Sequence, residues 1–94
     1  MVRSRSIIAT PPGATIKEQL NDRGMSQKEF AVRIDMSEKH VSKLINGEVQ
    51  LTPEVAVRLE IVLGVPARFW NNLEAIYREK LIKIAAEKLS LIHI

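Results

Sequence analysis

Two short helical patterns, residues 26–34 and 37–46, are separated in the chain only by Asp35 and Met36. Helices joined by so short a turn must cross at a steep angle, which is the geometry of a helix-turn-helix motif. The small Ala31 is expected where the two helices approach most closely, with Met36 filling the angle between them. Apolar residues recur at helical spacing on one face of each pattern, which predicts a shared core; they are Phe30, Ala31 and Ile34, then Val41, Leu44 and Ile45.

Helix-capping residues mark the ends of both patterns. Ser26, with Glu29 three residues later, predicts a capping box, in which each side chain satisfies the other residue's free backbone amide. Ser37 opens the second helix, and Asn46 with Gly47 ends it, because both tolerate the left-handed conformation that helix ends often need. The caps therefore place the starts and ends of both helices where the apolar spacing also places them.

The outer face of the second helix is polar. It carries Glu38, Lys39, Ser42, Lys43 and Asn46, with His40 at its edge. A helix with one buried stripe and one hydrogen-bonding face suits the major groove of DNA, which is about 12 Å wide. The alternative is a solvated helix pair in a small bundle, where a charged outer face has no function. Because the caps, the small residue, the break length and the polar face agree, we favour DNA binding.

The composition narrows the kinds of function that the chain can have. Its 94 residues fit a single domain, and the absence of cysteine excludes disulfides and thiolate metal sites. The 14 basic and 11 acidic side chains give a net charge of +3, which permits nucleic-acid binding without requiring it. No apolar run approaches the roughly 20 residues of a membrane span, so we expect a cytoplasmic protein. No nucleophile–base pair or ligand cluster occurs at a usable spacing, so we expect no enzyme activity, no cofactor and no metal.

Residues 11–66 are expected to form the helix-turn-helix DNA-binding domain. In its first helix, Thr15 with Glu18 three residues later predicts a capping box. Thr52 followed by Pro53 predicts the start of the helix after the motif, because a cap residue and a proline at the first helical position are a strong start signal. Together with a long last helix, these elements predict an all-α fold of five helices.

The last helix, residues 67–88, carries a wide apolar band. We expect Phe69, Trp70 and Leu73 to cover the core. Beyond Tyr77 the helix outruns a domain of this size, which predicts that its apolar face is covered by a second copy of the chain. The candidate dimerisation residues are Trp70, Leu73, Tyr77, Leu81 and Ile84.

The two ends of the chain differ from the domain between them. Residues 1–10, with Arg3 and Arg5, are expected to form a flexible basic arm. Residues 89–94, LSLIHI, break the charged helical pattern and match the translation of a transposase-type sequencing adapter. We interpret them as a non-native tail that interrupts a reading frame continuing past Lys88, and exclude them from fold reasoning.

Five segments between Pro11 and Tyr77 carry a resemblance to a known family: PPG, SQKEFA, SEKHVSKLING, LTPE and ARFWNNLEAIY. Together they closely resemble the HigA-type antitoxins of the Cro/C1 (XRE) helix-turn-helix class. The resemblance implies a five-helix, lambda repressor-like domain that binds a palindromic operator of double-stranded DNA as a homodimer. It also implies repression of the protein's own operon and neutralisation of a partner toxin, typically one that cleaves RNA. The chain departs from the family at Asp35, where the turn usually has glycine, although aspartate tolerates a positive φ better than most residues.

The resemblance also implies which residues meet DNA. Gln27, the first residue of the first motif helix, can bridge a phosphate, and Ser37 can donate to a phosphate because a helix start favours anions. Lysine suits guanine acceptors or phosphate, whereas Glu38 could accept from cytosine. The full set of DNA-binding candidates is Gln27, Ser37, Glu38, Lys39, His40, Ser42, Lys43 and Asn46.

Two alternatives to the antitoxin stay open at this point. Similar modules form the front part of longer regulators that end in an ImmA/IrrE-like zinc metallopeptidase, although this chain has no HExxH motif and so cannot perform that chemistry itself. The other alternative is a protein-interaction module that has kept the fold but no longer reads DNA.

Overall fold

The computed structural model describes the backbone of residues 9–93 and the side chains of residues 9–89. Its helices are α1 (Pro12–Arg23), α2 (Gln27–Ile34), α3 (Glu38–Ile45), α4 (Pro53–Leu63) and α5 (Ala67–His93). The all-α fold of five helices is therefore confirmed. The arginines of the predicted arm, Arg3 and Arg5, lie outside the described residues.

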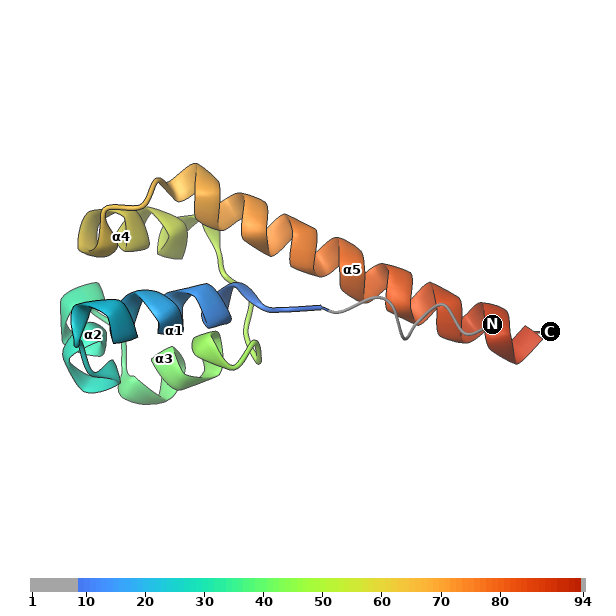
Figure 1. The fold of residues 1–94 in the computed structure, drawn as a ribbon, viewed down its shortest axis with the longest axis horizontal. Helices are drawn as coiled ribbons and strands as arrows, with labels where there is room; N and C mark the ends of the chain where they lie inside the picture. The colour runs from blue at the N-terminus through green and yellow to red at the C-terminus, as the bar shows by residue number, and fades with distance from the viewer. Residues whose placement is uncertain (1–8, 94) are drawn as a thin grey trace.

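The helices form a compact body with one long extension (Figure 1). α1, α2 and α3 lie together on one side, α4 and the first half of α5 lie opposite them, and the rest of α5 projects beyond the body. With 27 residues at 1.5 Å each, α5 is about 40 Å long. Among the residues that the structure describes, no helix is both long and apolar enough to cross a membrane.

The core lies between these two groups of helices. Ile16 of α1, Phe30 of α2, Val41 of α3, Leu59 of α4 and Trp70 of α5 have no exposed surface. Burying one such large side chain stabilises the fold by roughly 1.5–3 kcal/mol. All six apolar motif residues named from the sequence are buried, which confirms the predicted inner faces of α2 and α3.

The predicted start of α1 is wrong. The helix begins at Pro12, with Pro11 as its N-terminal cap, and Thr15 lies inside the first turns. A proline fits the first helical position because its fixed φ suits the helix and its missing N–H would have no partner there anyway. The amide of Ala14 already donates to the carbonyl of Pro11, at 3.0 Å, which closes the first turn without Thr15.

The apolar start of α5 is only partly buried. Trp70 is fully buried, and its Nε1 donates to the carbonyl of Val65 at 3.2 Å. Phe69 was expected in the core, but it is 41% exposed, and its ring lies nearly perpendicular to the Trp70 ring with 5.3 Å between the two centroids. Neighbouring positions on a helix point about 100° apart, so one core could not hold both rings equally. The helix also continues past Lys88, where its predicted end lay, to His93.

Candidate nucleic-acid interface

The first helix of the motif, α2, begins at a serine cap. The Ser26 Oγ accepts a hydrogen bond from the Glu29 amide at 3.0 Å, as predicted. The Glu29 carboxylate, however, is bound by the Arg33 guanidinium, with 2.9 Å between Oε2 and Nη2. The capping box is therefore half formed, because the glutamate pairs with the arginine one turn ahead instead of with the Ser26 amide.

The turn between α2 and α3 is built on Asp35. Its φ is 59°, in the left-handed region, as its position in the turn predicts. The Met36 amide donates to the Ala31 carbonyl at 3.0 Å, which is the closing bond of a Schellman turn. From α4, the Arg58 guanidinium donates to the carbonyls of Ile34 and Asp35 at 3.3 and 3.2 Å. The turn is thus held from both inside and outside the motif.

The start of α3 is fixed in the same way as the start of α2. The Ser37 Oγ accepts from the His40 amide at 3.1 Å, so the serine hydroxyl hydrogen stays available to an anion at the helix start. The side chains of the polar outer face divide by exposure. Gln27, Ser37, Glu38, Lys39, His40 and Asn46 are exposed, while Ser42 and Lys43 are half-buried.

The end of α3 is a second Schellman turn. The Glu48 amide donates to the Lys43 carbonyl at 2.8 Å, and the Gly47 amide donates to the Leu44 carbonyl at 3.2 Å. Gly47 takes the left-handed conformation, with φ at 79°, whereas Asn46 stays right-handed, with φ at −83°. The predicted stop is confirmed, and the glycine alone provides the positive φ.

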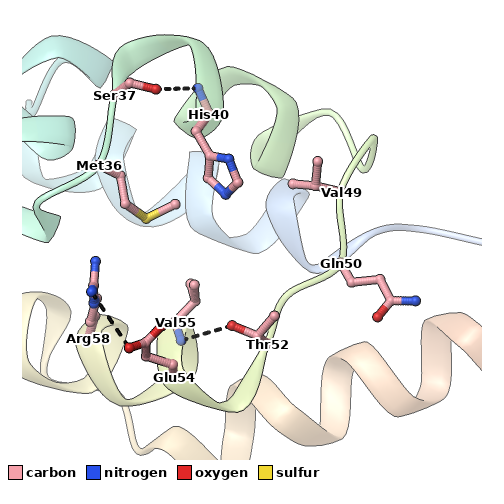
Figure 2. A pocket seen from close by; sticks show the side chains of 9 residues that line it. All are labelled: Met36, Ser37, His40, Val49, Gln50, Thr52, Glu54, Val55 and Arg58. Carbon is pink, nitrogen blue, oxygen red and sulfur yellow. Dashed lines mark hydrogen bonds and ion pairs between the residues drawn. The ribbon is translucent and has the colours of Figure 1, made fainter.

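A groove of about 630 Å³ lies beside α3 (Figure 2), between this helix, the loop that follows it and the start of α4. The His40 ring points into this groove, toward α4. On the opposite wall, Arg58 pairs with Glu54 at 3.8 Å. His40 therefore lies on the flank of the proposed DNA-facing surface.

The dimerisation candidates fall into two groups. Trp70 is buried in the chain's own core and so cannot contact a second copy, which corrects its place in the predicted set. Leu73, Tyr77, Leu81 and Ile84 are half-buried along α5. Further along the helix, Ile82 is 68% and Leu89 56% exposed, so apolar surface does remain where the helix leaves the body.

Two contacts, one to the turn of the motif and one to the loop that follows it, were not anticipated from the sequence. Arg58 of α4 binds the turn, as described above, and Glu74 of α5 accepts a hydrogen bond from the Leu51 amide at 3.3 Å. Both join residues more than 20 positions apart, so no local spacing indicates them. The only hint of such a contact in the sequence is a charged residue close to the helix face that is expected to pack on the core.

Comparison with solved structures supports the same architecture. A putative antidote protein of a plasmid maintenance system from Nostoc punctiforme is 26% identical, with a TM-score of 0.79 over 88% of this chain and 92% of that one. An addiction module antidote protein of the HigA family from Coxiella burnetii is 28% identical, with a TM-score of 0.76 over 89% and 91% of the two chains. The Pseudomonas aeruginosa antitoxin HigA with the higBA promoter is similar in fold, at 23% identity and a TM-score of 0.77 over 92% and 94%.

Sequence comparison identifies the family. The HTH-type transcriptional regulator YddM of Escherichia coli is 36% identical over 63 residues, which are 67% of each chain. The regulator YbaQ of the same species is 35% identical over 66 residues, or 70% of this chain and 58% of YbaQ. The family model described as helix-turn-helix, HTH_3, matches residues 16–70, from α1 to the buried tryptophan. The chain therefore belongs to the Cro/C1 (XRE) type of the helix-turn-helix family and is an HTH-type transcriptional regulator, not an enzyme.

Proposed function

We propose that the chain is a dimeric repressor of antitoxin type, which binds a palindromic operator of its own operon and neutralises a partner toxin. The observation that carries the proposal is the outer face of α3. Its polar side chains are not used by the core, while the start of the helix is capped by Ser37 and its end is fixed by the Schellman turn at Gly47. Such a fixed, polar, eight-residue helix is about 12 Å long, which suits insertion into the major groove.

The side chains of this face have different proposed roles. Lys39 and Lys43, one helical turn apart, read guanine acceptors or bind phosphate, and Glu38 selects for cytosine or against wrong sequences. Gln27 and Ser37, at the starts of the two motif helices, contact phosphates, because helix starts present free amides to anions. The remaining candidates, Ser42, Asn46 and His40, contact the groove edge or the backbone.

The long helix α5 supports dimerisation. Its outer part carries Leu81, Ile82, Ile84 and Leu89, which one chain by itself leaves partly or largely exposed. A second copy packed against this surface would cover it, and a two-fold axis would place two copies of α3 on one face. The two helices would then meet half-sites about 34 Å apart on the operator.

Similarity to the antidote proteins of Nostoc and Coxiella, each over about nine-tenths of both chains, supports the antitoxin assignment. The proposed partner is a toxin, most simply an RNA-cleaving one encoded beside this gene. Co-expression of the neighbouring small reading frame with this protein should restore growth and protect cellular RNA, and joint purification should give one complex. A toxin-like neighbour whose RNA cleavage this chain does not inhibit contradicts the antitoxin part of the proposal.

The DNA-binding part is tested by fluorescence anisotropy with duplex DNA from upstream of the gene. Lys43→Ala should weaken specific binding, and Lys83→Ala, an equal charge loss on the exposed side of α5, should have a smaller effect. If Lys43 contacts phosphate, the slope of log K against log salt should fall by about 1. If it reads a base, sequence preference should change instead, with about 1–3 kcal/mol lost at that position.

Two results would refute DNA reading by α3. Equal losses for the two lysine variants would mean that only net charge matters. If the protein shows no specific DNA binding at all but still binds a protein partner, the result would favour the interaction module. A downstream frame that continues into HExxH would favour the metallopeptidase regulator instead.

A further inference from the structure

α5 contacts the loop that follows α3, residues 46–52, near both of its ends. The Glu74 Oε1 accepts a hydrogen bond from the Leu51 amide, with 3.3 Å between the two atoms. The Tyr77 hydroxyl lies beside Gly47, since a Cβ added to that glycine would be 3.3 Å from the hydroxyl oxygen. The helix that leaves the body therefore also holds the loop at the end of the proposed DNA-reading helix.

The Glu74 carboxylate is itself held in place. Its second oxygen, Oε2, accepts from the Arg78 Nε one turn ahead. The Arg78 guanidinium in turn lies over the Tyr77 ring, 5.1 Å from its centroid. The Glu74 side chain is only 14% exposed, so water competes little for either bond. The carboxylate is thus a fixed, charged acceptor for a single loop amide.

The loop passes this restraint on to α3. The Leu51 side chain is buried in the core, so its backbone has little freedom once its amide is bound. At the other end of the loop, the Glu48 amide donates to the Lys43 carbonyl at 2.8 Å. A displacement of the loop would therefore act on the last turn of α3, which carries one of the two proposed lysine contacts.

We infer that Glu74 is a positioning residue for DNA binding, which acts through the Leu51 amide without itself touching DNA. It holds the loop, and with it the last turn of α3, in the orientation that meets the groove. This inference rests on the proposed DNA-binding function. Because α5 is also the proposed dimer helix, the same carboxylate links the dimer to the orientation of α3.

The variants Glu74→Ala, Glu74→Gln and Glu79→Ala test this role. Loss of a negative charge and loss of the contact with Leu51 predict opposite changes in DNA affinity. Removing a carboxylate raises the positive charge of the protein, so a purely electrostatic effect tightens DNA binding. Loss of the charged acceptor of Leu51 should instead weaken specific binding about tenfold in Glu74→Ala, the usual scale for a hydrogen bond to a charged group. Glu74→Gln keeps an acceptor oxygen and should recover much of the affinity. Glu79→Ala, an exposed carboxylate on the same helix, measures the charge effect alone.

Two further measurements separate positioning from unfolding or from direct contact. The salt slope of Glu74→Ala should equal that of the wild type, because no phosphate contact is lost. Amide hydrogen exchange at Leu51, followed by NMR, should be faster in Glu74→Ala, nearly restored in Glu74→Gln and unchanged in Glu79→Ala. These readouts apply to any variant that keeps its helical circular dichroism, and Glu74→Gln preserves the shape of the site if the alanine variant does not fold.

The outcomes distinguish this inference from the proposed function. If the wild type binds specifically and Glu74→Ala binds equally or more tightly, the inference is wrong while the proposed function stands. Weaker binding with unchanged exchange at Leu51 also overturns it. A wild type that shows no specific binding overturns the proposed function, and this inference with it.

Discussion

Gly47, at the end of α3, differs from the other left-handed glycines in what surrounds it. Gly24, Gly47 and Gly64 all have φ between 64° and 79°. A Cβ at Gly24 or Gly64 would meet no atom within 4 Å, whereas at Gly47 it would lie 2.9 Å from the Pro11 Cβ and 3.3 Å from the Tyr77 hydroxyl. Alanine substitution at the three sites should therefore cost different amounts of folding free energy.

The magnitudes follow from two terms. A left-handed alanine costs about 1–2 kcal/mol at any of the three sites. At Gly47 the contact with the rigid ring of Pro11 adds strain of about 1–3 kcal/mol, the usual cost of overpacking. Gly47→Ala should thus lose about 2–5 kcal/mol in the free energy of unfolding, against about 1–2 kcal/mol for Gly24→Ala and Gly64→Ala.

Urea denaturation followed by circular dichroism measures these losses, and thermal melts give a second reading at about 4–8 °C per kcal/mol for a domain of this size. Gly24→Ala and Gly64→Ala serve as matched controls, because they share the backbone strain of a left-handed alanine and lack the contact with Pro11 and Tyr77. Equal losses at all three sites would refute the packing of the α3 end against Pro11 and Tyr77.

Two more substitutions test the supports of the motif. Gly13→Ala would normally favour a helix by up to about 1 kcal/mol, but the added Cβ would lie closer than 3 Å to the Ile45 backbone. We therefore expect a lower free energy of unfolding in urea denaturation. A higher value would contradict the close approach of α1 to α3. Arg58→Met keeps the aliphatic stem and removes the bonds to the Asp35 turn, which should cost about 1–3 kcal/mol. Glu54→Ala breaks the ion pair with Arg58 but leaves the bonds to the turn; because this glutamate is 79% exposed, the change should cost under about 1 kcal/mol. Equal losses of stability in Arg58→Met and Glu54→Ala would assign the effect of Arg58 to the ion pair.

Local features of the motif could be predicted from the sequence because each depends on neighbouring residues. The serine caps at Ser26 and Ser37, the left-handed Asp35 and the glycine ends are all set within one turn of chain. The same local reasoning misplaced the start of α1. It took Thr15 as the cap that opens the helix, although a proline such as Pro12 is also a favourable first helical residue.

The features that were missed depend on distant parts of the chain. Phe69 and Trp70 are adjacent aromatic residues on one apolar band, and how α5 packs against the other helices decides that Trp70, rather than Phe69, is fully buried. The bonds from Arg58 to the turn and from Glu74 to Leu51 join different helices. Their existence follows from how α4 and α5 pack, which spacing along one helix does not encode.

The contacts from Arg58 and Glu74 share one property: each ends on a backbone atom of the segment that it holds. Carbonyls and amides are the same for every amino acid except for the missing amide of proline. The side chains on the outer face of α3 can therefore be exchanged without loss of the bonds that orient the helix. A regulator built in this way can acquire a new operator through a few surface substitutions, and it is a suitable scaffold for grafting the α3 face of a relative with a different target.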